Sequence, residues 1–143
     1  MGFLDGLFGK KQDYPPLEES SPAASRIGQM KEPLEKLTSE FSDDIEIVPT
    51  EQVAYAFIGK PPKKFGVAWV EASGKINNFK TLVDEKGLSM PSLERLSNEL
   101  KDAYIRSENE SRYATTIADR KVVVTPSEAM ASDIKKIIDE FAK

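Results

Sequence analysis

The stretch VAYAFIGKPPKKFGVAWV, residues 53–70, decides the fold that we predict for this 143-residue chain. It is apolar at every position over Val53–Ile58 and again over Val67–Val70, which is the pattern of strands that are covered on both faces. The connection at residues 59–64 is short enough for a hairpin, although its paired prolines exclude the tightest two-residue turns. We therefore predict an antiparallel pair of strands at the centre of a sheet.

The register of this hairpin decides where its aromatic side chains lie. Successive residues of a strand face opposite sides of a sheet, so Tyr55 and Phe57 share one side of the first strand. If Phe57 lies opposite Gly66, aromatic and small residues interleave on both faces, whereas a shift of one residue gathers the aromatic side chains on one face. The sequence leaves both registers open.

Further strands are predicted where valine, isoleucine and aromatic residues cluster between turn residues. These segments are residues 45–48, 76–83, 113–118 and 121–125. The last two flank Asp119 and Arg120, and we expect them to form a second hairpin whose turn length stays open.

Three segments carry apolar residues at the spacings of three and four that mark one face of a helix. They are residues 32–42, residues 89–106 and a C-terminal segment that begins at TPSE. In TPSE, Thr125 as N-cap, Pro126 in the first turn and Glu128 predict a capping box. The fold class is therefore α+β: an antiparallel sheet of five to six strands with three helices, in the order α-β-β-β(-β)-α-β-β-α.

The chain divides into three regions. Residues 1–11 form a short amphipathic segment, residues 12–26 a disordered linker rich in proline, serine and acidic residues, and residues 27–143 a single α+β domain. Prolines in the linker remove hydrogen-bond donors, and its serines and glutamates supply no core. We thus expect a disordered N-terminal tail in front of the domain.

Composition excludes several classes of function. The chain has no cysteine and no histidine, which removes thiolate nucleophiles and the imidazole base or ligand of most hydrolases and metalloenzymes. Its net charge of −4 argues against nucleic-acid binding by counterion release. No apolar run approaches the roughly eighteen residues that span a bilayer. We expect a cytoplasmic, non-enzymatic protein without a cofactor.

The N-terminal segment has the layout of a short interfacial anchor, with apolar residues on one helical face and lysines behind them. It resembles the starts of bacterial proteins that touch membranes peripherally. We interpret it as a conditional hook for a partner or for a membrane surface. Its candidate contact residues are Phe3, Leu4, Leu7, Phe8, Lys10 and Lys11.

Aromatic residues of the predicted sheet are a second candidate site. They either face a partner across an uncovered sheet surface or line an apolar pocket between the sheet and a helix. A sheet that its own helices cover completely is the third interpretation. The candidate residues are Tyr55, Phe57, Trp69 and Phe79.

Two charged clusters complete the candidates. The tip of the central hairpin offers an anion contact through Lys60, Lys63 and Lys64, although an exposed loop that charge keeps soluble is the favoured interpretation. The densest acidic cluster of the domain is Asp43, Asp44 and Glu46. It lacks the spacing of a calcium loop, so we interpret it as a solvated loop.

The predicted function is that of a small, non-enzymatic, adaptor-like or chaperone-like protein that binds another protein, with a homodimer as one form of that partnership. A small-molecule sensor domain with an apolar pocket between sheet and helix is the alternative. The order of elements is similar to that of small acidic secretion chaperones, which carry a helix, three strands, a helix, two strands and a helix. This resemblance implies a protein partner.

Overall fold

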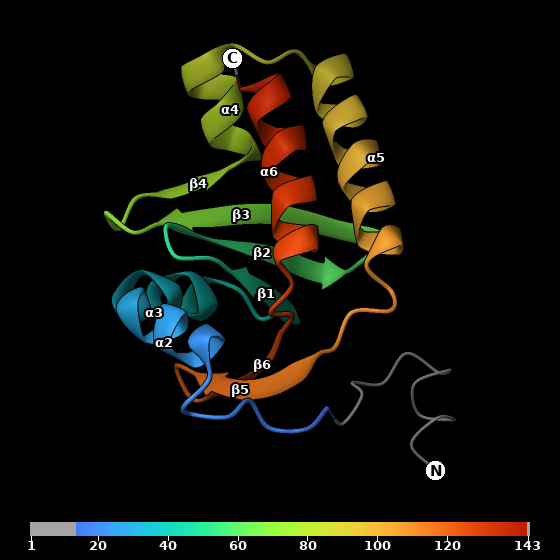
Figure 1. Ribbon diagram of the computed structural model, residues 1–143. Coiled ribbons are helices and arrows are strands. Elements are labelled where there is room, and N and C mark those ends of the chain that lie inside the picture. The colour runs from blue at the N-terminus through green and yellow to red at the C-terminus, as the bar shows by residue number, and fades with distance from the viewer. Residues whose placement is uncertain (1–13, 143) are drawn as a thin grey trace.

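The computed structural model describes residues 14–142. It shows a six-stranded sheet in the order β4-β3-β2-β1-β6-β5, with helices grouped on either side of it (Figure 1). The strands are β1 (Ile45–Pro49), β2 (Val53–Lys60), β3 (Lys64–Glu71), β4 (Ile76–Asn78), β5 (Tyr113–Ile117) and β6 (Arg120–Val124). The helices are α2 (Pro22–Gln29), α3 (Lys31–Glu40), α4 (Phe79–Lys86), α5 (Met90–Arg106) and α6 (Glu128–Phe141).

The sheet is mixed, and this corrects the prediction of a wholly antiparallel one. The α+β class is confirmed, but β1 and β6 run parallel, with Glu46 opposite Val123 and Ile47 opposite Val124. All other neighbouring strands are antiparallel. The second hairpin lies beside β1 after a long crossover through α5. Tertiary packing therefore sets the direction of β6 relative to β1, and no local sequence pattern predicts this direction.

The prediction of three helices is also wrong, because the described residues contain five. The stretch predicted as one strand at residues 76–83 ends as a strand at Asn78. There the Asn78 side chain accepts a hydrogen bond from the Thr81 N–H at 3.0 Å, and the Thr81 hydroxyl oxygen accepts one from the Asn78 N–H at 3.2 Å. This capping box begins α4, and Gly87 in the left-handed region ends it.

The structure also corrects the predicted disordered linker over its described residues. The Leu17 N–H donates to the Ala114 carbonyl at 2.8 Å, and the Ala114 N–H donates to the Pro15 carbonyl at 2.9 Å, so this segment pairs with the outer edge of β5. Pro22 stands at the start of α2, where a proline costs no hydrogen bond. The N-terminal arm, as we call residues 14–17, and α2 therefore belong to the domain.

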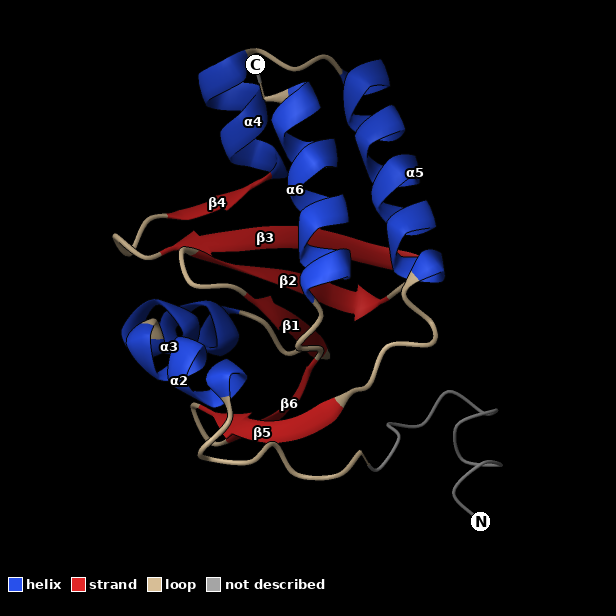
Figure 2. Cartoon of the chain, viewed as in Figure 1, coloured by secondary structure: helices blue, strands red, loops and turns tan. Residues whose placement is uncertain are grey.

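The central hairpin adopts the register that gathers its aromatic residues on one face. Phe57 lies opposite Val67, Ile58 opposite Gly66, and Tyr55 opposite Trp69. The aromatic face packs against α4, α5 and α6, and the alanine-rich face packs against α2 and α3. Figure 2 shows these two groups of helices with the strands between them. The central strands are thus covered on both faces, as their continuous apolar sequence predicts.

Candidate functional site

Two adjoining surface cavities lie along α6 and form the candidate site. Each has a volume of about 400 Å³. They share Gln52, Val53, Tyr55 and Lys135, so they adjoin each other between α6 and the ends of β2 and β3. We call this surface the α6 groove and define it by Val53, Tyr55, Trp69, Ala131, Lys135 and Ile138.

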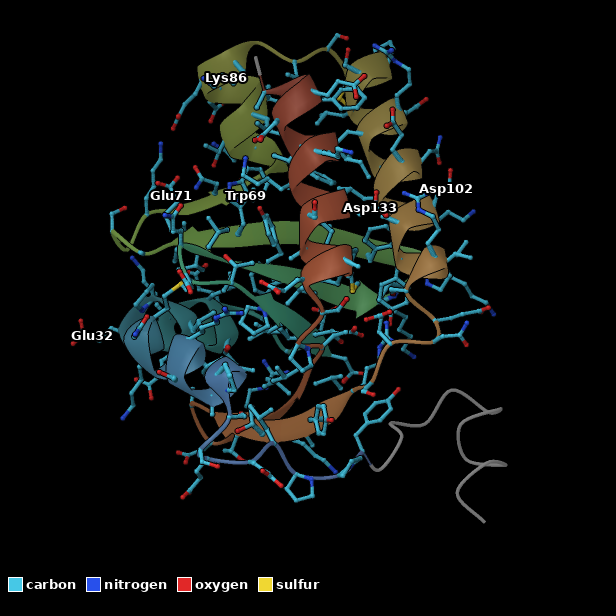
Figure 3. All side chains as sticks on the ribbon, viewed as in Figure 1. Glu32, Trp69, Glu71, Lys86, Asp102 and Asp133 are labelled. Atoms are coloured by element: carbon cyan, nitrogen blue, oxygen red, sulfur yellow. The ribbon has the colours of Figure 1, made fainter. Side chains whose placement is uncertain are left out.

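An aromatic pair forms the floor of the α6 groove. Tyr55 on β2 and Trp69 on β3 are direct cross-strand partners, and the strand register turns both side chains toward α6. Tyr55 is 4% exposed, whereas Trp69 is only half-buried. Figure 3 labels Trp69 and Glu71 at the end of β3 that emerges beside α6. A half-buried tryptophan in a depression offers a partner apolar area at a small cost in side-chain entropy.

The rim of the α6 groove is charged and on balance acidic. Two basic residues, Arg26 and Lys135, and four acidic ones line the two cavities, which gives a formal charge of −2. Lys135 lies 2.6 Å from Asp139, and Arg26 lies 3.6 Å from Glu51. Burial, assisted by the negative charge of Asp139, raises the pKa of Tyr55 to about 12. The groove therefore favours an apolar ligand that carries positive charge.

A second feature, the Glu46 cluster, lies beneath the opposite end of the sheet and α5. The Glu46 carboxylate accepts hydrogen bonds from the Tyr104 hydroxyl at 2.7 Å, the Arg112 Nε at 2.9 Å and the Thr125 hydroxyl at 2.6 Å. The Arg112 guanidinium also lies over the Tyr104 ring, 5.2 Å from its centroid. Through these contacts β1 is joined to the end of α5, the α5–β5 loop and the residue that follows β6.

The Glu46 cluster has the properties of a structural ion pair. Arg112 makes further hydrogen bonds to the carbonyl and hydroxyl oxygens of Ser107, at 3.0 and 2.9 Å. Burial and the Glu46 carboxylate raise the pKa of Tyr104, so its hydroxyl stays a donor at neutral pH. Burial, the largest single influence, opposes the charged form of Arg112, but the charge and hydrogen bond of Glu46 together with the nearby Tyr104 and Tyr14 hydroxyls outweigh it and raise the pKa of the guanidinium. The raised pKa keeps the Arg112 guanidinium charged, as a buried ion pair requires.

The cluster also corrects the predicted start of the last helix. Thr125 does not cap α6, because the helix begins only at Glu128 and the Thr125 side chain is directed to Glu46. Ser127 is the N-cap instead, and its side chain accepts from the Met130 N–H at 3.0 Å.

The four predicted aromatic site residues do not share one pocket. Tyr55 and Trp69 meet in the α6 groove. Phe57 is fully buried in the core and borders a cavity of about 200 Å³ beside the Glu46 cluster. Phe79 begins α4 and borders a different cavity, of about 360 Å³, between α3 and β3. The structure therefore brings together two of the four.

The predicted charged candidates do not line the α6 groove. Lys60 and Lys64 face each other across the β2–β3 hairpin, and Lys63 stands in its turn. The acidic cluster does not form a solvated loop throughout, because Glu46 is buried in its ion pair. Within residues 14–142 no three metal-ligating side chains converge. The six candidate residues of the segment at 1–11 lie outside the described residues.

The sequence analysis did not single out Arg112 of the Glu46 cluster or Lys135 of the α6 groove. The sequence does signal that Glu46 needs a partner, because it interrupts the apolar run IEIV and a charge on a buried strand requires one, but it does not identify Arg112 as that partner. No comparable signal marks Lys135, which looks like any exposed lysine of an amphipathic helix.

Comparison with known proteins gives no relative. No protein-family model, no curated protein and no solved structure matches this chain. A search of the described helices finds none with the length and apolar character needed to cross a bilayer. Function is therefore inferred from the geometry of the α6 groove.

Proposed function

We propose that this domain binds another protein by taking a segment of that partner into the α6 groove. The observation that supports this most is that two adjoining cavities share Tyr55, with Trp69 beside it in one of them and charged side chains of both signs around them. Central aromatic contacts within a polar rim are typical of protein-binding surfaces.

The shape of the groove favours a peptide segment over a small molecule. From Glu128 to Ile138, α6 rises about 15 Å, at 1.5 Å per residue. An extended segment of about five residues covers that length, at roughly 3.3 Å per residue. Small-molecule sites bury most of the surface of their ligand inside a concave pocket, whereas this depression runs openly along the side of a helix. The acidic rim adds a preference for basic residues in the bound segment.

Crosslinking at the groove tests the proposal. A photoreactive phenylalanine analogue replaces Ser132, which lines the groove on α6, in full-length protein expressed in its native cells. We expect a crosslink to one protein, at an apolar segment that contains lysine or arginine. The substitution Trp69→Ser should abolish this crosslink, because it removes the exposed part of the aromatic floor.

A matched control uses an apolar side chain outside the groove. Met90 is 69% exposed at the start of α5, so Met90→Ser should leave the crosslink unchanged. Thermal unfolding of both variants verifies that they are folded. A crosslink that survives Trp69→Ser would refute the proposal. A compound of low molecular mass bound to the protein in native mass spectrometry and lost in Trp69→Ser would also refute it and would indicate a sensor domain. If crosslinks form only between copies of this chain, the partner is a second copy and the protein is a homodimer.

A further inference from the structure

A third cavity, larger than either cavity of the α6 groove, lies at the first turn of α6. Its volume is about 720 Å³, and it shares Arg26 and Glu128 with the groove. The third cavity therefore adjoins the groove, and one extended segment of a partner can contact both. Its uncharged walls include Pro15, Pro16, Pro22, Tyr113 and Pro126.

The walls of the third cavity are held in place before a ligand binds. Proline has a fixed φ, and it loses almost no side-chain entropy when it is ordered. The N-terminal arm runs beside β5 (Figure 1), where two backbone hydrogen bonds to Ala114 fix it. The four prolines are exposed and Tyr113 is half-buried. This surface is thus accessible, and its order lowers the entropic cost of binding.

The charges of the third cavity are acidic once the ion pair of Arg26 is taken into account. Arg26 lies 3.6 Å from Glu51, which lines the neighbouring cavity of the groove. The other charged residues that line the third cavity are Glu18 and Glu128. Both are exposed, and neither forms an ion pair with another residue of the range 14–142. A positively charged side chain that enters the cavity would therefore meet two carboxylates.

A basic residue of the partner matches both the apolar walls and the charge of this cavity. The methylene stem of arginine or lysine packs along apolar surface while its charged end stays at the carboxylates. Arginine fits better than lysine, because its planar guanidinium also stacks on aromatic rings such as that of Tyr113 and binds a carboxylate through two donors.

Helix α6 sets the distance between this cavity and the aromatic floor of the groove. Glu128 borders the third cavity, and Ile138 borders the cavity that contains Trp69. From Glu128 to Ile138 the helix rises about 15 Å, at 1.5 Å per residue. An extended segment covers this distance with about four to five residues.

We propose that the third cavity binds a basic residue, preferably arginine, of the same partner segment whose apolar residue contacts Trp69. The two residues are about four to five positions apart in the partner. The inference rests on the proposed function of the α6 groove and adds the sequence motif that the groove recognises. The apolar contact supplies affinity, and the basic residue excludes segments with the wrong charge or spacing.

A displayed library of random twelve-residue peptides, selected on the full-length protein, tests this motif. We expect the selected peptides to carry arginine or lysine about four to five positions from an aromatic or aliphatic residue. The double substitution Glu18→Lys and Glu128→Lys should weaken the binding of a selected peptide by about tenfold, which corresponds to about 1.4 kcal/mol. Glu18→Gln with Glu128→Gln removes the charges without adding repulsion, so it should cause a smaller loss.

The matched control places the same two charge changes outside the cavities. Glu94 and Glu108 are exposed and line none of the three cavities. Glu94→Lys with Glu108→Lys changes the net charge equally and should leave peptide binding unchanged. Thermal unfolding of each variant verifies that it is folded.

Three results would overturn the inference. They are selected peptides without a basic residue at the expected spacing, equal losses in the two double lysine variants, and a dimer in sedimentation that Glu18→Lys with Glu128→Lys dissociates. The last result would identify a second copy as the occupant.

The variant Trp69→Ser separates this inference from the proposed function. A loss of peptide binding in Trp69→Ser but not in the variants of Glu18 and Glu128 would retain the α6 groove as a peptide site and reject the contact with a basic residue. A loss only in the glutamate variants would do the reverse. If no peptide is selected, both are rejected.

Discussion

Replacing Arg112 by methionine should cost more stability than any other exchange of a charged side chain for an apolar one in the described part of the chain. Arg112 and Glu46 are both almost fully buried, with side chains 8% and 9% exposed. The exchange keeps much of the side-chain volume but removes the Nε donor at 2.9 Å and the bonds to Ser107. Glu46 then keeps only the hydroxyl donors of Tyr104 and Thr125 for a full negative charge.

The size of this effect follows from the burial of the pair. Removing one partner of a buried ion pair costs about 3–5 kcal/mol, because the other charge stays desolvated. The total stability of a domain is about 5–15 kcal/mol, so Arg112→Met should consume a large part of it. The midpoint of thermal unfolding should fall by roughly 10 °C, at about 2–4 °C per kcal/mol for a domain of this size.

Urea unfolding of three variants measures the effect. Arg106→Met is the matched control, since Arg106 pairs with Asp133 at 2.8 Å while 56% of its side chain is exposed, and exposed pairs contribute about 0–1 kcal/mol. Adding Glu46→Gln to Arg112→Met should recover part of the loss, because the buried negative charge is gone. If Arg112→Met and Arg106→Met cost the same, or if Glu46→Gln recovers nothing, the assignment of the Glu46 cluster as a buried ion pair is wrong.

Three further predictions concern single residues. Arg120 donates to the carbonyls of Thr38, Phe41 and Asp43 at the end of α3, so Arg120→Ala should cost about 2 kcal/mol in urea unfolding, and an unchanged midpoint would contradict this role. Gly59 has a φ of +115°, and an added Cβ would lie 2.8 Å from the Lys64 carbonyl oxygen, whereas nothing lies within 4 Å of a Cβ at Gly66. Gly59→Ala should therefore lower the free energy of unfolding by more than about 1 kcal/mol, and Gly66→Ala should leave it unchanged or raise it by up to about 1 kcal/mol. A larger loss for Gly66→Ala than for Gly59→Ala would refute this local geometry. The pKa of Tyr55 is raised from 10.0 to about 12, so the unfolded chain loses this proton first and the free energy of unfolding falls as the pH rises from about 10 to about 12. In Tyr55→Phe the midpoint of urea unfolding should therefore decrease less steeply with pH over this range. An equally steep decrease in the variant would count against the raised pKa.

Local patterns predicted the elements whose signals lie within a few residues. Helix α5 begins at Met90 with Ser89 as its N-cap and ends at Arg106, as its apolar spacing predicts. The central hairpin is also where continuous apolar sequence places it. The misplaced elements are those with competing signals: Asn78 ends a strand that valine and phenylalanine would continue, and Pro22 starts a helix in a stretch that resembles a linker.

The candidate site was accessible to prediction only in part. Tyr55 and Trp69 were named as surface or pocket residues, and they do lie together. Phe57 and Phe79, named beside them, lie elsewhere. Alternation along a strand assigns residues to two faces, but it does not tell which positions the covering helix leaves open. That depends on where α6 crosses the sheet.

The sequence by itself therefore determined the class of the fold, the central strands, the long amphipathic helices and the absence of cysteine and histidine. These properties depend on composition and on periodicity over a few residues. The tertiary structure alone decided the parallel pairing of β1 with β6, the register that gathers the aromatic residues under α6, and the partnership of Glu46 with Arg112 across 66 positions of the chain. Such contacts depend on which distant segments bury each other's apolar surface and neutralise each other's charge, and no local pattern records that choice.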